Sequence, residues 1–209
     1  MDEVSEPGTA RHWDSAYEEG DASCSWFEER PGRSLDMLER AGVTPRDSVI
    51  DVGGGTARLV DELIARGFGD LTVLDVSEVA LSRARSRLRA RADRVTWLVA
   101  DLLEWVPART YRVWHDRAVF HFMTAEDDQR RYLEALHAAT SAGAVAIFGC
   151  FAVDGPSSCS GLPVARYEPA GLAERLGEQW QLVAEGREEH TTPTRVVQPF
   201  SWAALRRTS

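Results

Sequence analysis

The chain has 209 residues, of which 44% are hydrophobic and 27% charged, and its formal net charge at pH 7 is −9. This length predicts one domain with a single core, and the acidic balance disfavours nucleic acid as a partner, because binding to a phosphate backbone depends on a positive field. No apolar stretch reaches the roughly 18 residues of a membrane-spanning helix, and the polar N-terminus is unlike a signal peptide, so we expect a cytoplasmic protein without a membrane partner.

The N-terminal part of the chain is expected to be helical after a short tail. We predict that residues 1–10 are a disordered tail and that residues 11–209 form a single domain. Within it, residues 11–42 are expected to hold two short helices, the second over Ser34–Arg40 with Leu35 and Leu38 inward. These helices are expected to form a lid over a site.

Strands and helices alternate through the middle of the chain. Apolar runs and helical spacing predict strands at 48–52, 71–76, 95–100, 111–116 and 144–151, with helices at 56–66, 78–90 and 125–140. This alternation is typical of a doubly wound α/β fold, whose mostly parallel sheet is covered by helices on both faces. A long loop at 154–168 follows, which we expect to meet the substrate, then a helix from Pro169 and strands near 180–189 and 195–202.

The most informative motif follows the first strand. That strand ends at Asp51, and Gly53–Gly55 form a turn before a helix. A turn without Cβ atoms lets a ligand approach backbone N–H groups, and a helix N-terminus favours a negatively charged group. Asp75 ends the next strand, where its carboxylate can accept hydrogen bonds from both hydroxyls of a ribose. The pattern therefore predicts a site for an adenosine-containing cofactor.

Departures from two nucleotide-binding motifs narrow the choice of cofactor. The nicotinamide fingerprint G-x-G-x-x-G requires a third glycine where this chain has Arg58, and a phosphate-binding P-loop requires lysine, which the chain lacks. The pattern D-x-G-x-G with an acid after the next strand resembles motif I of the class I S-adenosylmethionine-dependent methyltransferases. Asp101 and Leu102 after the third strand extend the resemblance, which implies that they meet the adenine amino group and ring. A nicotinamide enzyme and a domain of this fold with another role are the alternatives.

Three further segments resemble the thiopurine and tellurite-resistance branch of that family. Asp116 to Phe120 resembles its D-R-(G/A)-A-L motif, residues 151–164 its G-P-P-F segment, and residues 12–27 its aromatic opening. The resemblance implies a Rossmann-like methyltransferase fold with seven strands and an antiparallel edge hairpin. It also implies that aromatic residues cover the cofactor, that Val52 contacts it through the backbone, and that Arg117 lies near the methionine carboxylate or the substrate. The insert at 157–161 departs from the family pattern, and a similar D-K/R-G-x-x-D element occurs in protein lysine methyltransferases.

The end of the fourth strand supplies the catalytic candidates His115, Asp116 and Arg117. The structural alternatives are a capping role for Asp116 and a packed core position for His115 and for His121. The two histidines and Asp116 could suggest a 2-His-1-carboxylate metal site, but adjacent side chains of a strand point to opposite faces, so no metal is expected. The three cysteines lack metal-ligand spacing and fit free thiols.

The expected reaction is transfer of the sulfonium methyl group of S-adenosylmethionine to a small molecule. Because this methyl group is already activated, the enzyme mainly aligns donor and acceptor, and a thiol, selenol or metalloid acceptor needs no strong base. N-methylation of a protein lysine or a small amine, or a non-catalytic cofactor-binding module, are the alternatives, and we expect a monomer or dimer. The cofactor is expected to contact Trp13, Tyr17, Asp51, Val52, Gly53, Gly55, Asp75, Val76, Asp101, Leu102 and Arg117, and the acceptor to contact Trp26, His121 and Cys159.

Overall fold

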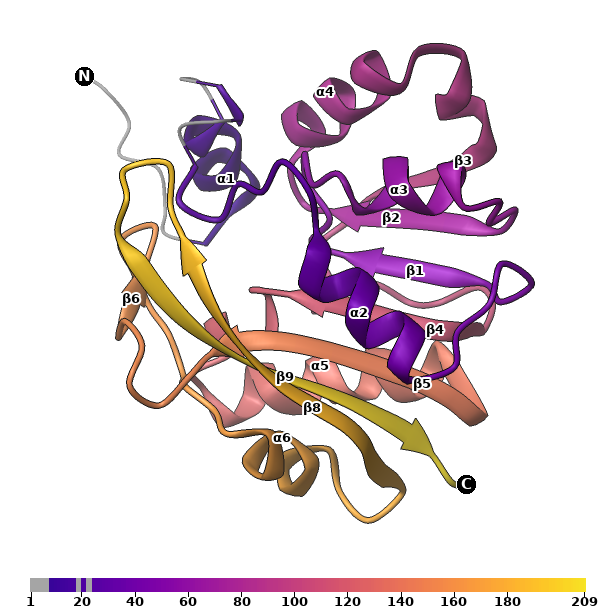
Figure 1. Cartoon of the computed structure of the whole chain (residues 1–209), viewed down its shortest axis with the longest axis vertical. Helices are drawn as coiled ribbons and strands as arrows, with labels where there is room; N and C mark the ends of the chain where they lie inside the picture. The colour runs from indigo at the N-terminus through magenta and orange to yellow at the C-terminus, as the bar shows by residue number, and fades with distance from the viewer. Residues whose placement is uncertain (1–7, 18–19, 22–23) are drawn as a thin grey trace.

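The computed structural model describes residues 8–17, 20–21 and 24–209 (Figure 1). Its centre is a seven-stranded sheet of order β3-β2-β1-β4-β5-β9-β8. The strands β1 to β5 run parallel to one another, and the order reverses between β1 and β4, which is where ligands bind in open α/β sheets. This confirms the predicted doubly wound, mostly parallel sheet. These strands are β1 (Val49–Val52), β2 (Leu71–Asp75), β3 (Val95–Val99), β4 (Tyr111–Arg117) and β5 (Thr140–Phe151).

Helices cover both faces of the sheet because its central strands are apolar on both sides. Val49 joins one core cluster with residues of α2, α3 and α4, whereas Ile50 joins another with residues of α5 and α6. In Figure 1, α2 lies in front of the sheet and α5 behind it. Consecutive residues of β1 thus enter opposite cores, as the two-residue period of a strand requires. These helices are α2 (Gly32–Arg40), α3 (Leu59–Ala65), α4 (Glu78–Leu88), α5 (Glu126–Ala138) and α6 (Pro169–Leu176).

The expected antiparallel hairpin lies at the sheet edge. It consists of β8 (Trp180–Thr191) and β9 (Val197–Arg207), and β9 also pairs antiparallel with β5. β9 runs five residues past the predicted end at 202, to 207. The Arg207 guanidinium donates to the carbonyl oxygens of His137 at 2.8 Å and Thr140 at 2.7 Å, which fastens the end of the strand to the start of β5.

Two predicted boundaries shift where the backbone must turn. The helix expected at 56–66 begins only at Leu59, because residues 54–57 form a turn in which the Ala57 N–H donates to the Gly54 carbonyl. The loop expected at 154–168 contains a small hairpin of β6 (Ser158–Cys159) and β7 (Leu162–Pro163). None of the described helices combines the length and apolar character that a membrane crossing requires.

The N-terminal helices differ from the expected tail and lid. Residues 1–7 of the expected tail lie outside the described residues, whereas Ala10 already begins α1 (Ala10–Ala16), which contacts α4. α2 does not cover a site, because it buries Leu35, Met37 and Leu38 against the sheet and contacts β5, β8 and β9. Of the two helices, α1 alone keeps a position suited to a lid.

Candidate active site

A pocket of about 380 Å³ opens at the carboxyl ends of β1, β2 and β4. This is the edge at which the topology predicts a ligand, and the volume lies in the range of small-molecule sites, roughly 300–1,000 Å³. Of the residues predicted for cofactor or acceptor, those in the pocket wall are Trp13, Tyr17, Trp26, Gly53, Asp75, Val76, Asp101, Leu102, Arg117 and Cys159.

The glycine turn fits closely under its neighbours. Gly53 has φ +60° and Gly55 has φ +48°, a region that side chains other than glycine rarely adopt. A Cβ atom on Gly53 would overlap the Val119 side chain, and one on Gly55 would lie 2.5 Å from the Tyr17 hydroxyl oxygen. Both positions therefore require glycine, for conformation and for space.

Asp75 presents a largely desolvated carboxylate to the pocket. Burial raises its pKa to about 6, and the nearby Asp51 and Asp14 add to that shift, while hydrogen bonds from the Ser77 and Gly55 backbone N–H groups counteract it. The Ser77 N–H donates to Asp75 Oδ1 at 2.8 Å, which fixes the side chain at the end of β2. A ligand hydroxyl that donates to this carboxylate would stabilise its ionised form.

Asp101, the acid after β3, is exposed to solvent, unlike Asp75. Its Oδ1 accepts a hydrogen bond from the Leu103 N–H at 2.9 Å. Leu102 is buried in the core cluster beside it. The pocket therefore has one carboxylate deep in its wall, that of Asp75, and another at its solvent side.

Aromatic side chains from three segments form one wall. Trp13 of α1 packs edge-on against Phe122 with ring centroids 5.0 Å apart and against Trp26 at 6.1 Å. Tyr17 packs edge-on against Trp26 at 6.0 Å. This aromatic group joins α1, the segment after it and the turn that follows β4, so the wall depends on where α1 lies.

Arg117 lines the pocket, but its terminal nitrogens are engaged elsewhere. Nη1 donates to the Trp26 carbonyl oxygen at 2.8 Å, and Nη2 lies 3.3 Å from Glu28 Oε1. The guanidinium also sits over the Phe200 ring, 5.1 Å from its centroid. These contacts occupy both terminal nitrogens, and the predicted catalytic and cofactor roles of Arg117 stay predictions.

Asp116 and His115 are buried and lie outside the described pocket wall, and their predicted catalytic roles stay predictions. Asp116 is fully buried, and its carboxylate accepts hydrogen bonds from the N–H groups of Val119 at 3.0 Å and Phe120 at 2.9 Å and from the Tyr132 hydroxyl at 2.5 Å. Burial raises the pKa of Asp116 to about 6, although these hydrogen bonds oppose the shift. Asp116 thus caps the turn after β4, which was its structural alternative.

His115 is clamped between two buried partners on the opposite side of β4. Its Nδ1 lies 2.7 Å from Asp51 Oδ1, and its Nε2 lies 2.9 Å from Ser34 Oγ of α2. Asp51, His115 and Ser34 border a separate cavity of about 50 Å³ instead of the main pocket. Asp51 is therefore outside the described wall of the main pocket, and its Oδ2 lies beside Gly54, where a Cβ atom would be 2.7 Å away.

His121 is also outside the described pocket wall, and its predicted acceptor contact stays a prediction. The residue is fully buried, and within the described chain neither ring nitrogen has a hydrogen-bond partner. Burial and the charge of Arg117 lower its pKa to about 3, so the ring is neutral. Cys159 does reach the pocket, and burial raises the pKa of its thiol. Val52 and Gly55 are absent from the described pocket wall, and their predicted backbone contacts stay predictions.

Several pocket residues were missed from the sequence. The largest group belongs to the turn after β4, and Leu74, Ala100 and Leu103 lie at the ends of β2 and β3, at the same sheet edge as the motif residues, so the topology rule for α/β sheets was the available signal. Others come from the β6–β7 hairpin and from the start of α5. The missed residues are Gly8, Leu74, Ala100, Leu103, Ala118, Val119, Phe122, Met123, Thr124, Asp128, Leu162 and Pro163.

Comparison with known proteins finds similar sequences among methyltransferases. Residues 49–143 match a family model described as a methyltransferase domain. The mouse EEF1A lysine methyltransferase 2 is 32% identical over 90 residues, which cover 39% of this chain and 37% of that protein. The mouse eEF1A lysine and N-terminal methyltransferase is 23% identical over 126 residues, which cover 58% of this chain but only 18% of that protein. The chain thus spans well under half the length of these relatives.

Solved structures resemble the whole fold. A 1,6-didemethyltoxoflavin-N1-methyltransferase from Burkholderia thailandensis has a TM-score of 0.77 at 18% identity and covers 96% of this chain and 87% of its own. A structure from work on the conversion of a disulfide bond into a thioacetal group during echinomycin biosynthesis has a TM-score of 0.73 at 23% identity. The match covers 96% of this chain and 93% of that chain. Residues 49–143 are therefore similar to a methyltransferase domain, and the chain as a whole has the fold of the class I S-adenosylmethionine-dependent methyltransferases.

Proposed function

We propose that this protein transfers the methyl group of S-adenosylmethionine to a small-molecule acceptor with a soft nucleophilic atom. The observation that carries the proposal is one pocket wall that combines the glycine turn at Gly53, the Asp75 carboxylate at the end of β2 and the Asp101 carboxylate after β3. Each lies at the carboxyl end of a parallel strand, beside the reversal of strand order.

The residues present fit this cofactor. The turn at Gly53 leaves no room for a Cβ atom, as expected where a ligand and a packed side chain crowd the backbone. Asp75 would hold the ribose hydroxyls, Asp101 would accept from the adenine amino group, and Leu102 would lie against the ring. Trp13 and Tyr17 would cover the bound molecule. The cofactor supplies a methyl group already activated on its sulfonium.

The chain's own contribution is alignment and exclusion of water. Trp13, Trp26 and Phe122 close one side of the pocket with apolar surface, which keeps the reacting atoms together in a site of low polarity. Neither His115 nor His121 belongs to the described pocket wall. A thiol or selenol, which ionises by itself, suits such a site better than a phenol or an ammonium that needs a base.

A second candidate is methylation of an amine or a protein lysine. The matched mouse relatives are named as lysine methyltransferases. Asp128, at the start of α5, lies in the pocket wall, and its carboxylate would attract a cationic amine or accept its proton. A cofactor-binding module without catalysis is the third reading.

A tritiated-methyl transfer assay separates these candidates. The acceptors are a panel of thiols, selenols, phenols, small amines and lysine peptides, with wild-type protein and Asp128→Asn in parallel. We expect turnover with thiols or selenols, a rate that rises with ionisation of the acceptor, and little effect of Asp128→Asn. Turnover confined to amines or lysine peptides and abolished by Asp128→Asn would replace the soft-acceptor proposal.

A further inference from the structure

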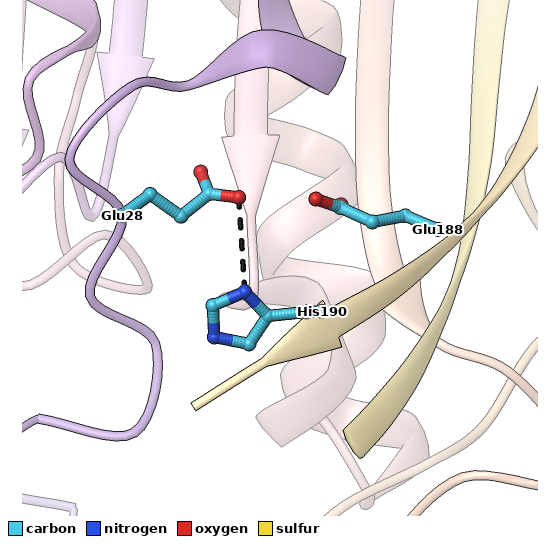
Figure 2. A group of neighbouring side chains, drawn as sticks. All are labelled: Glu28, Glu188 and His190. Atoms are coloured by element: carbon cyan, nitrogen blue, oxygen red, sulfur yellow. Dashed lines mark ion pairs between the residues drawn. The ribbon is translucent and has the colours of Figure 1, made fainter. Parts of the chain in front are cut away.

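A cluster of ionisable side chains lies behind the aromatic wall. Glu28 precedes α2, Arg117 ends β4, and Glu188 and His190 lie on β8. Figure 2 shows the Glu28 carboxylate directed toward His190, with Glu188 opposite. Glu28 Oε1 lies 3.3 Å from Arg117 Nη2 and 3.8 Å from His190 Nδ1. The side chains of Glu28, Arg117 and His190 are no more than 14% exposed, so the contacts are shielded from water.

This cluster holds two consecutive carbonyl groups of the segment that carries Trp26. His190 Nε2 lies 2.7 Å from the Ser25 carbonyl oxygen and therefore carries the proton that it donates. Arg117 donates to the Trp26 carbonyl oxygen at 2.8 Å. With Glu28 on the same guanidinium, the segment is fastened at three points to β4 and β8.

The Trp26 side chain is what the segment presents to the pocket. It lines the pocket wall and packs against Trp13 and Tyr17. Because the wall is built from contacts among these rings, release of the backbone at residues 25–28 would open it. The cluster is thus linked to the pocket through Trp26, although Glu28 and His190 do not line the pocket themselves.

With both carboxyl groups ionised and His190 neutral, the cluster carries one negative charge more than positive charges, so it can take up one proton. The Glu28 carboxylate lies near both the Glu188 carboxylate and the Arg117 guanidinium, and His190 uses its only ring proton on Ser25. Burial and the neighbouring Glu188 raise the pKa of Glu28 from 4.5 to about 7, although Arg117 opposes the shift. Glu188 is itself fixed by a hydrogen bond, because the Trp202 indole Nε1–H of β9 donates to its Oε2 at 2.8 Å. A proton between the two carboxyl groups makes the cluster neutral.

A divalent metal ion suits the same residues less well. The ligand atoms of Glu28, Glu188 and His190 lie within 4.8 Å of one another, which is a grouping that can hold a metal. But the Arg117 guanidinium already faces the two lone pairs that a metal would use, at 3.3 Å from Glu28 Oε1 and 3.5 Å from His190 Nδ1. The Arg117 guanidinium and one proton therefore balance the negative charge of Glu28 and Glu188 without a metal ion.

On the basis of the proposed function, we propose that Glu28, Arg117 and His190 are positioning residues. They hold the segment of residues 25–28, and with it the Trp26 wall, closed over bound S-adenosylmethionine, and a proton shared by Glu28 and Glu188 keeps the cluster together. The groups that face Glu28 are Arg117 from β4 and Glu188 and His190 from β8, with Glu29 and Arg30 on its own segment.

The sign of the pH effect follows from the direction of the shift. A carboxyl group with a raised pKa in the closed form favours closure fully below its ordinary pKa of 4.5. The advantage is lost as pH rises toward 7 and levels off above it. Closure should therefore weaken by up to about tenfold per pH unit in this window, which is the limit for one linked proton.

Amide hydrogen exchange tests the closure without any ligand. The Phe27 N–H donates to the Cys24 carbonyl at 3.0 Å and reports on the segment. In wild-type protein, its protection factor, corrected for the intrinsic rate, should fall between pH 5 and pH 7. Glu28→Gln, which mimics the protonated carboxyl, should keep it constant. Glu29→Gln is the matched control, because Glu29 is 87% exposed and pairs only loosely with Arg58, at 3.9 Å.

Ligand binding provides the second readout. The ratio of the S-adenosylhomocysteine dissociation constants of wild-type protein and Glu28→Gln should rise from pH 5 to pH 7, whereas Glu29→Gln should follow wild type. The positioning role would be overturned if the ratio of dissociation constants and the Phe27 protection factor both stayed constant from pH 5 to pH 7. Failure of the ligand to bind any variant would refute the proposed function instead, and the exchange experiment would still decide the role of the cluster. A rise in melting temperature with Zn²⁺ that His190→Ala abolishes would show a metal centre and overturn the shared proton.

Discussion

The Ser77 hydroxyl lies 2.6 Å from Asp14 Oδ1, and this hydrogen bond ties α1 to the start of α4. Ser77 is the N-cap of α4, since its Oγ also accepts from the Ala80 N–H at 3.0 Å. Asp14 lies where the helix dipole favours a negative charge. Trp13 stands on the same helix and Tyr17 caps its end, so this hydrogen bond helps to place two pocket residues.

Asp14→Ala should therefore loosen the lid without unfolding the protein. Loss of one hydrogen bond to a charged group is expected to weaken S-adenosylhomocysteine binding by about 1–2 kcal/mol, because the bound lid must then be ordered at greater entropic cost. Isothermal titration calorimetry measures this. Asp36→Ala is the control, since Asp36 pairs with Arg33 at 3.0 Å on the surface of α2. Equal affinities for wild type and Asp14→Ala would show that the contact does not hold the lid.

The affinity for the cofactor should depend on the ionisation of Asp75. Its pKa of about 6 in the free protein means that the carboxylate is protonated at lower pH and is then a weaker acceptor for ribose hydroxyls. Binding should accordingly weaken as pH falls through 6. The measurement is best made in Glu28→Gln, which removes the carboxyl group expected to titrate near 7. An affinity that stays constant from pH 5 to pH 8 in that variant would argue against the ribose contact.

The two buried histidines near the end of β4 should respond oppositely to replacement by leucine. His121→Leu removes two buried ring nitrogens that have no partner within the described chain, so the free energy of unfolding should rise by about 1–2 kcal/mol. His115→Leu leaves Asp51 and Ser34 without their partner and should lower it by about 1–3 kcal/mol. Urea unfolding followed by tryptophan fluorescence gives both values. The same sign for both variants would contradict the described contacts.

Methyl transfer should be more sensitive to Trp13 than to His121. His121→Leu should slow turnover far less than the roughly 10²–10⁴-fold typical of losing a general base. Trp13→Ala should slow it more, because removal of the ring admits water and loosens the alignment of the donor. Steady-state kinetics on the acceptor found in the panel provides the comparison. A collapse of turnover in His121→Leu with unchanged cofactor affinity would favour an acceptor that needs a base.

The positions of Gly53 and Asp75 in the pocket wall could be predicted from sequence because their signals are local. Gly53 and Asp75 each follow an apolar strand, and parallel strands bring their carboxyl ends to one edge. The roles of His115 and Asp116 depend instead on distant partners. Strand alternation sends His115 toward Ser34 of α2 and Asp116 toward Tyr132 of α5, and nothing in the local sequence identifies either partner.

The direct test of the central claim is calorimetric titration of wild-type protein and Asp75→Ala with S-adenosylhomocysteine. Asp70→Ala serves as control, because Asp70 lies on the surface and its carboxylate, 45% exposed, pairs with Arg109. The account predicts binding to wild type and to the control, with binding to Asp75→Ala weaker by about 1–3 kcal/mol because the ribose hydroxyls lose their acceptor. Absence of binding at millimolar concentration, or an Asp75→Ala affinity equal to that of wild type, would contradict it.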